Sequence, residues 1–278
     1  MRVRAPQVHL LSDGTMKLDG GTMFGQVPRD QWGELTRPDK RNRIPLGLNV
    51  FLIRSDAGNI LVDTGAGGKL DEAQVDRFGL KANRLRRSLR DVGLKPADIK
   101  YVVLTHLHFD HAGGATRRNR KGETVPTFPK ARYLIQSDAW EHAAAPSERA
   151  SAAFIEDDYL PLWENGQVDI VDGDQELIPG VWLKNTGGHS QGHQVVYVKN
   201  GSSKMAFLGD LVPTAYHLGL PYISATDQFP EETLERKRHI LGRAEREGWL
   251  IFFAHGCDNR AGVLERRGER LTLRPVAV

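Results

Sequence analysis

A nearly continuous apolar run, Ile99 to Thr105, leads directly into a six-residue segment that holds His106, His108, Asp110 and His111. Such a run is typical of a strand buried on both faces, as in a parallel sheet covered by helices. Residues two apart in an extended chain face the same side, so His106 and His108 leave the strand end together. Asp110 and His111 follow one turn later, at the expected start of a helix, and can point into the same space. The sequence therefore predicts a layered α/β fold with a metal site at this strand end.

Three further side chains of the kind that binds metals also follow apolar strands and stand in glycine-containing loops. They are His189 after 181–185, Asp210 after 204–208 and His255 after 250–253. Glycine lets the backbone come close to a metal, and loops at strand ends often carry functional groups. Seven candidate ligands exceed the three or four that one catalytic zinc takes, so we expect a centre with two metal ions.

The remaining pattern of apolar runs and turns predicts strands and helices in both halves of the chain, with no linker between them. Helical spacing covers Leu70 to Val92 and Glu231 to Glu247, and another helix starts at Ser137. The additional expected strands are Val8 to Leu11, Asn49 to Ile53, Asn59 to Val62, Ala131 to Gln136, Val168 to Val171 and Gln194 to Val198. Strands interspersed with helices throughout indicate one domain.

Composition narrows the classes of function. With 40% hydrophobic residues, the 278-residue chain can bury a sizeable core. The formal net charge of +3 is too small to argue for nucleic acid as a partner. Cys257 is the single cysteine, which rules out an internal disulfide and suits a reducing compartment. Neither a signal peptide nor a run of about 18 apolar residues is present, so we expect a cytoplasmic protein without membrane contact.

The order of the motifs resembles that of the metallo-β-lactamase superfamily from about residue 45 to 256: His-x-His-x-Asp-His, then Gly-His, Gly-Asp and a late Ala-His-Gly. Val-Asp-Thr-Gly at 62–65 is similar to the superfamily's early Asp-Thr-Gly element. The chain most resembles the quorum-quenching lactonase and methyl parathion hydrolase branch, through 19–25, 126–131 and 209–217. The resemblance implies a single metallo-β-lactamase-like domain over 1–278, folded as a four-layer αβ/βα sandwich.

The resemblance also implies how the ligands are shared between two divalent metal ions. One ion would take His106, His108 and His189, the other would take Asp110, His111 and His255, and Asp210 would bridge them. Asp63 would accept the free N–H of a ligand histidine and so fix its tautomer. Imidazole and carboxylate ligands suit Zn²⁺ as the expected ion, and also Mn²⁺, Fe²⁺ or Co²⁺.

Two divalent ions that share one water can lower its pKa toward neutrality, so a metal-bridging hydroxide would be present at pH 7 without a cysteine or serine nucleophile. That hydroxide would attack a carbonyl whose oxygen one of the ions polarises. Asp110 is expected to be catalytic, because its spare carboxylate oxygen can orient the hydroxide or pass a proton to the leaving oxygen.

The substrate contacts depart from the family pattern. Many lactonases of this branch have a substrate-orienting tyrosine three positions after the bridging aspartate, and here Pro213 stands there. Tyr216 or His217 is expected to take that catalytic role. Alternatively, His217 has a structural role and does not contact the substrate.

The segment from Gly20 to Pro45 is too long for a simple connection. It contains Met23, Phe24 and Trp32, which are either part of the core or an apolar lid over the site. Its length favours the lid, and a lid would make lactones with longer acyl chains bind better.

Several other residues are expected to support the structure rather than to bind metal. His193 begins a strand and is interpreted as a structural histidine or one that supports the ligands. His9, His142 and His239 have no nearby partners of ligand type in the sequence. Cys257 follows His255 closely and is interpreted as a small buried neighbour of the site.

The predicted function is hydrolysis of a small-molecule lactone or ester, most like an acyl-homoserine lactonase, with phosphotriester hydrolysis as a side activity. One alternative is a thioester hydrolase of the glyoxalase II kind, which needs a cationic patch for glutathione. A nucleic-acid-processing protein would need an added domain. A binding protein without catalysis conflicts with seven filled ligand positions. The sequence is compatible with a homodimer as the oligomeric state.

Overall fold

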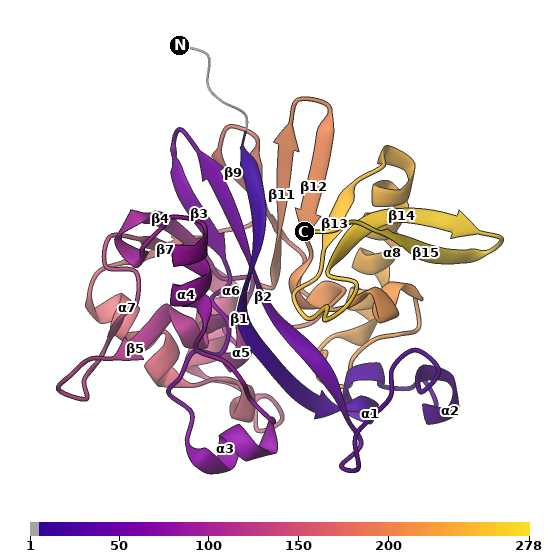
Figure 1. Ribbon diagram of the computed structural model, residues 1–278, viewed down its shortest axis with the longest axis horizontal. Helices are drawn as coiled ribbons and strands as arrows, with labels where there is room; N and C mark the ends of the chain where they lie inside the picture. The colour runs from indigo at the N-terminus through magenta and orange to yellow at the C-terminus, as the bar shows by residue number, and fades with distance from the viewer. Residues whose placement is uncertain (1–5) are drawn as a thin grey trace.

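A computed structural model describes residues 6–278 and shows two β-sheets packed face to face, with helices on both outer sides. In Figure 1, α4 and α7 lie on the left of the sheets and α8 lies on the right. This arrangement is the expected four-layer αβ/βα sandwich. No helix of residues 6–278 is long and apolar enough to cross a membrane.

The first sheet has six strands in the order β1-β2-β3-β4-β7-β8, and β3, β4, β7 and β8 run parallel. Its strands are β1 (Gln7–Asp19), β2 (Arg43–Ser55), β3 (Gly58–Val62), β4 (Ile99–Val103), β7 (Arg132–Gln136) and β8 (Val168–Val171). Two short strands, β5 (Thr116–Arg118) and β6 (Thr124–Pro126), pair separately. Because the carboxyl ends of parallel strands share one sheet edge, the loop after β4 opens at that edge.

The second sheet has seven strands in the order β15-β14-β13-β12-β11-β10-β9, antiparallel except for β12 and β13. The strands are β9 (Gln175–Ile178), β10 (Val181–Asn185), β11 (Gln194–Asn200), β12 (Ser203–Phe207), β13 (Leu250–Phe252), β14 (Ala261–Arg267) and β15 (Arg270–Pro275). The sequence pattern did not reveal β9 or the β14–β15 hairpin. The charged side chains of the hairpin hide the apolar alternation of a strand.

The helices are short except for the last one. They are α1 (Gly20–Phe24), α2 (Arg29–Trp32), α3 (Glu72–Arg77), α4 (Leu85–Asp91), α5 (Phe109–Ala112), α6 (Ser137–Ala144), α7 (Leu160–Glu164) and α8 (Pro230–Glu247). Short 3₁₀ turns occur at Pro96–Asp98, Gly113–Ala115, Ser151–Ala153, Glu156–Asp158, Gly209–Leu211 and Ala215–Leu218. α8 starts with proline, has two glutamates in its first turn and ends at a left-handed glycine, all of which favour these helix ends.

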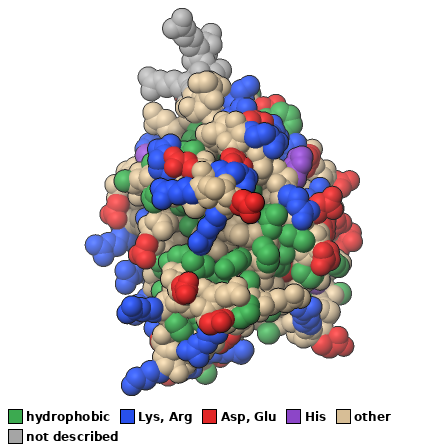
Figure 2. Space-filling model, turned by 90° about the vertical axis from the view of Figure 1, so that its right-hand side faces the viewer, with side chains coloured by type: hydrophobic (Ala, Val, Ile, Leu, Met, Phe, Trp, Pro, Cys, Tyr) green, Lys and Arg blue, Asp and Glu red, His purple; other side chains and the backbone are tan. Residues whose placement is uncertain are grey.

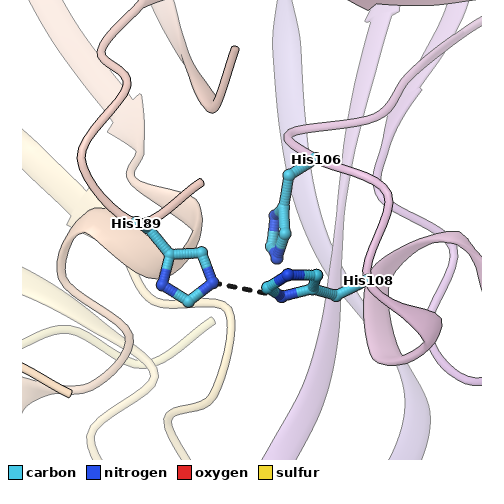
Figure 3. A group of neighbouring side chains, drawn as sticks. All are labelled: His106, His108 and His189. Carbon is cyan, nitrogen blue, oxygen red and sulfur yellow. Dashed lines mark hydrogen bonds between the residues drawn. The ribbon is translucent and has the colours of Figure 1, made fainter. Parts of the chain in front are cut away.

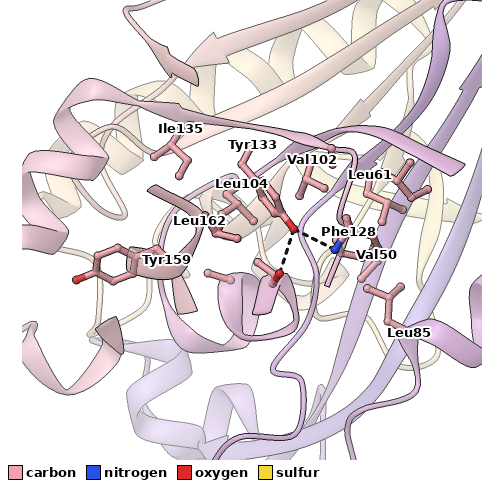
Figure 4. Close-up of a cluster of buried hydrophobic side chains, with 14 of the residues drawn as sticks. Val50, Leu61, Leu85, Val102, Leu104, Phe128, Tyr133, Ile135, Tyr159 and Leu162 are labelled. Atoms are coloured by element: carbon pink, nitrogen blue, oxygen red, sulfur yellow. Dashed lines mark hydrogen bonds between the residues drawn. The ribbon is translucent and has the colours of Figure 1, made fainter. Parts of the chain in front are cut away.

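Both faces of the first sheet are buried, which explains its almost fully apolar strands. In β2, Val50 and Leu52 belong to the cluster beneath the helices, and Phe51 and Ile53 belong to the cluster between the two sheets. Figure 4 shows part of the first cluster. There the hydroxyl of the buried Tyr133 donates to a backbone carbonyl at 3.0 Å, so its polar atom is satisfied within an apolar environment.

The predicted helix from Leu70 to Val92 is wrong as a single element. Two helices, α3 and α4, occupy its ends, and the chain between them turns through left-handed backbone at Gly79 and Asn83. Lys81 there forms a two-way backbone bridge with Thr15 of β1. Pairing with the sheet therefore overrides helical spacing in this segment.

Met23, Phe24 and Trp32 pack in the core, as the core alternative predicts, and only Met23 of the three also lines the cavity beside the candidate ligands. Met23, Phe24 and Trp32 are at most 3% exposed and belong to one buried cluster. The ring of Phe24 lies between those of Trp32 and His217, at centroid distances of 5.3 and 4.9 Å. The long segment is ordered by α1 and α2 and packs inward, which removes its aromatic side chains from water.

Candidate metal centre

The loop after β4 brings its four polar side chains together as the sequence predicts. β4 ends at Val103, and α5 starts at Phe109 with His108 as the residue before its first turn. His106, His108, Asp110 and His111 are all at most 8% exposed. Buried polar side chains on consecutive turns must find partners, and here those partners are one another and residues of distant loops.

One group of three side chains is formed by His106, His108 and His189 (Figure 3). Their rings point toward a common centre, and one ring nitrogen from each lies within 4.8 Å of the others. His189 Nε2 and His108 Nδ1 are 3.2 Å apart. His189 stands in the loop between β10 and β11, so this group joins the two sheets.

A second group is formed by Asp110, His111 and His255. The Nε2 atoms of His111 and His255 are 3.1 Å apart, and Asp110 Oδ2 is 3.6 Å from His255 Nε2. His255 follows β13, so this group also takes ligands from both sheets.

Asp210 lies between the two groups. Its Oδ1 is 3.3 Å from His111 Nε2 and 3.1 Å from His255 Nε2, and its Oδ2 is 3.6 Å from His189 Nε2. One carboxylate oxygen thus faces each group, which is the geometry that a bridging ligand needs.

The outer ring nitrogens of four histidines are held by hydrogen bonds. The N–H groups at Nδ1 of His111 and His189 each donate to a carboxylate at 2.7 Å, from Asp63 and Asp227 respectively. The Nδ1 of His255 donates to the Gly47 carbonyl at 2.8 Å, and that of His106 lies 3.0 Å from the Thr105 hydroxyl. These contacts place a proton on Nδ1, so it is Nε2 of each ring that faces the centre.

Asp63 carries out the orienting role that the sequence predicted, and it also fixes the ligand loop. Its carboxylate accepts from the Thr105 backbone N–H at 2.8 Å and from the Thr105 hydroxyl at 3.0 Å, besides His111. Asp63 has a φ of 61°, a left-handed conformation that costs a non-glycine residue energy.

Asp227 is a supporting residue that the sequence analysis missed. It lies 38 positions after His189, in a loop without a recognisable motif. Only the folded chain brings the two together, so no local pattern could have identified it.

Burial and the carboxylates shift the pKa values of the clustered histidines in opposite directions. Burial and the neighbouring imidazoles lower the pKa of His106 and His108 well below the usual value. For His111, burial lowers the pKa, but the carboxylates of Asp210 and Asp63 outweigh it and raise the pKa well above the usual value. Anionic and lone-pair atoms that converge in this way require protons or cations between them.

The donor set fits divalent cations. His106 Nε2 and Asp210 Oδ1 are buried and accept no hydrogen bond, which is costly unless a cation or water occupies the centre. Five imidazole nitrogens and two carboxylates are the donors that Zn²⁺ and similar ions prefer.

The centre opens into a cavity of about 870 Å³, which we call the metal cavity. His108, Asp110, His189, Asp210 and His255 line it together with Phe109 and several alanines of residues 150–153. A cavity of this size suits a small organic substrate.

Comparison with known proteins identifies the family. The model of the metallo-beta-lactamase superfamily matches residues 43–255, which include all seven converging side chains. The chain belongs to the metallo-beta-lactamase superfamily. The expected fold class and family resemblance are thereby confirmed.

Relatives within the superfamily lie in its lactonase branch. An N-acyl homoserine lactonase of Rhizobium radiobacter is 32% identical over 265 residues, which cover 87% of this chain and 92% of the relative. An N-acyl homoserine lactonase of Bacillus cereus is 27% identical over 235 residues, covering 80% and 86%. The solved structure of a probable metal-dependent hydrolase from Staphylococcus aureus is 28% identical and covers all of both chains, with a TM-score of 0.88.

The expected catalytic role of His217 is contradicted by its position in this superfamily member. His217 is fully buried; its Nε2–H donates to the Met23 carbonyl at 2.8 Å, and its Nδ1 lies 2.8 Å from the Thr214 hydroxyl. Burial lowers its pKa to about 3, so the ring is neutral. With both nitrogens occupied, His217 holds the α1 segment and cannot contact a substrate.

Tyr216 also stays outside the metal cavity. It lines a separate groove between α2, α8 and the β14–β15 hairpin. Figure 2 looks onto this side of the molecule, where hydrophobic side chains gather among charged ones. The structure therefore places Tyr216 outside the cavity in which the sequence expected its substrate contact, and the described residues that line the metal cavity include no tyrosine.

His193 is a supporting residue, as expected, and not a ligand. Its Nδ1 lies 2.7 Å from the Thr186 hydroxyl, and its Nε2 accepts from the backbone N–H of Asp210 at 3.1 Å. It therefore fixes the loop that carries Asp210.

Proposed function

We propose that this hydrolase opens small lactones or esters, with N-acyl homoserine lactones as its main substrate class and phosphotriesters as a side activity. The observation that carries the proposal is the position of Asp210 between two groups of three ligands on the wall of a cavity of about 870 Å³. The relatives named N-acyl homoserine lactonase support the substrate class.

The two metal ions would be held as the groups of side chains indicate. His106, His108 and His189 would hold one ion, Asp110, His111 and His255 would hold the other, and Asp210 would contact both. Zinc is the proposed ion, because these nitrogen and oxygen donors suit it. When bound, a pair of such ions lowers the pKa of a shared water and polarises the carbonyl of the substrate.

Asp110 is the proposed proton carrier. It lines the cavity, is 8% exposed, and approaches His255 through Oδ2 alone. A carboxylate oxygen of Asp110 can accept a proton from the attacking water and return it to the alkoxide oxygen that leaves when the ring opens.

The glyoxalase II-like alternative finds less support. The basic runs of residues 84–87 and 117–121 do not line the metal cavity. Of the cations that line this cavity, Lys17 and Arg43 pair with Asp39, and Arg41 pairs with Asp76. Arg77 and Arg149 also line it and pair with no carboxylate of the described residues, so the comparison with the thioester is left to the substrate panel.

Metal analysis combined with a substrate panel tests the proposal. We expect about two ions per chain in active protein purified without chelator, and hydrolysis of N-acyl lactones ahead of simple esters and glutathione thioesters. A fully active sample with one ion would contradict the two-ion centre. Faster hydrolysis of the thioester would favour the alternative function.

A further inference from the structure

A strip of chain, residues 227–229, is hydrogen-bonded directly to the segment that carries His189. The backbone N–H of Gln228 donates to the His189 carbonyl at 3.1 Å, and that of Phe229 donates to the Gly188 carbonyl at 2.9 Å. Asp227 holds the His189 ring from the same strip. The position of Gln228 is thus fixed relative to a side chain of the metal centre.

The side chain of Gln228 lines the metal cavity. Its Nε2 lies 3.4 Å from Nε2 of His142, which lines the same cavity. Its Oε1 accepts no hydrogen bond from the described residues and is not among their buried unpartnered atoms, so it is accessible. An accessible amide oxygen beside the centre is a neutral acceptor for a ligand N–H.

His142 is itself held in place. Its ring packs on Phe154 at a centroid distance of 5.2 Å, and Phe154 packs on the ligand His108 at 4.9 Å. Partial burial lowers the pKa of His142, and its Nδ1 has no hydrogen-bond partner among the described residues. When the neutral ring carries its proton on Nδ1, its Nε2 accepts from the Gln228 NH₂ group at 3.4 Å, and Oε1 is left for the cavity.

Two other polar groups of the same wall are already engaged, whereas Gln191 also lines the cavity but no hydrogen bond to a described residue holds its side chain in place. The hydroxyl of Thr226 bonds to that of Ser224, and Arg149 donates to the Ala225 carbonyl. An N-acylated lactone carries its amide N–H on the carbon next to the ring carbonyl. In a substrate whose ring carbonyl lies at the metal centre, that N–H is therefore one carbon away from the reacting group, inside the cavity that Gln228 lines.

We propose that Gln228 is a specificity-determining residue, whose Oε1 accepts the amide N–H of an N-acylated lactone, and that His142 is the positioning residue for its side chain. This inference rests on the proposed lactonase function. It explains how the site can select N-acylated lactones when the described residues lining the metal cavity include no tyrosine.

The test compares two substrates on the metal-loaded enzyme: N-hexanoyl homoserine lactone and a γ-alkyl lactone of similar length that has no amide. Gln228→Met removes the acceptor at similar volume, and we expect its KM for the N-acyl lactone to rise about tenfold with kcat within twofold. Its KM for the amide-free lactone should rise less than twofold. His142→Phe keeps the ring packing and should raise KM for the N-acyl lactone about threefold.

The matched control is Gln191→Met, because Gln191 lines the same cavity and has no hydrogen bond to a described residue. It should leave the preference between the two lactones unchanged. An equal KM change for both substrates in Gln228→Met, or no change, would overturn the assignment of Gln228 alone. A wild-type enzyme that opens neither lactone would overturn the proposed function, and the inference with it.

Discussion

The two halves of the chain build the centre in different ways. The first half supplies His106, His108, Asp110 and His111 from one six-residue segment. The second half supplies His189, Asp210 and His255 from three loops that follow β10, β12 and β13. Spacing along the chain positions the first four side chains, which we call the local set. Only the complete second sheet positions the other three, which we call the dispersed set.

The supporting contacts differ in the same way. In the first half, the single carboxylate of Asp63 holds both Thr105 and His111. In the second half each ligand has its own support: Asp227 for His189, the Gly47 carbonyl for His255, and His193 for the backbone of Asp210. Support is thus concentrated in one residue for the local set and divided among several for the dispersed set.

Removal of Asp210 tests the dispersed set most severely. Asp210→Ala should lower kcat/KM for the N-acyl lactone by on the order of a thousandfold, because both metal positions lose a ligand. Elemental analysis should show fewer than two ions per chain, with an unchanged circular dichroism spectrum. Retention of two ions and high turnover would mean that the local set alone builds the centre.

Asp110→Asn probes the local set at one position. The amide is a weaker ligand and cannot accept a proton, so we expect a loss of about a hundredfold in kcat, with the fold retained. Steady-state kinetics on samples of measured metal content provide the check. Near-normal turnover in a folded, metal-loaded variant would move the proton transfer elsewhere.

The two orienting carboxylates offer a direct contrast between the halves. Asp63→Asn and Asp227→Asn should each lower metal affinity by about 10- to 100-fold, the usual range for such supports. We expect the larger loss for Asp63→Asn, because Asp63 also fixes Thr105, and asparagine tolerates its left-handed backbone. Competition with a chromogenic chelator measures both, and a larger loss in Asp227→Asn would reverse the comparison.

Phe24→Ala should affect stability far more than chemistry. Phe24 is buried against His217, so its removal should cost about 3 to 5 kcal/mol of unfolding free energy. Below the unfolding transition, kcat should change less than threefold, because the ligands are untouched. Urea denaturation and kinetics on the same sample would check both, and a preserved stability would show that α1 is not part of the core.

The smallest effect is expected at Tyr216. Because its side chain lies in the separate groove, Tyr216→Phe should change kcat and KM less than twofold. Steady-state kinetics with the N-acyl lactone measures both constants. A large rise in KM would show that the Tyr216 loop moves toward the cavity during turnover.

The same contrast explains what the sequence could predict. The ligand loop and the strand ends before His189, Asp210 and His255 are local patterns, and the structure brings these side chains together as expected. Asp227 and the hydrogen bond from His217 to Met23 depend on contacts between distant segments, so they carry no local signal. The split between α3 and α4 was missed because the pairing of Lys81 with Thr15 is tertiary.

Two hydrogen bonds join Asn49 of β2 to the chain around His255, and they form late in folding because they span most of the chain. Asn49 donates through its side-chain amide to the carbonyls of Phe253 and Gly256, across 204 and 207 positions of chain. Closing so long a loop is entropically costly and slow. A ribosome-bound chain would expose the local histidines well before His255 is synthesised, so an ion captured early would meet an incomplete coordination sphere. Refolding with metal present from the start should therefore yield some chains with a kinetically trapped ion, and metal added after folding should not.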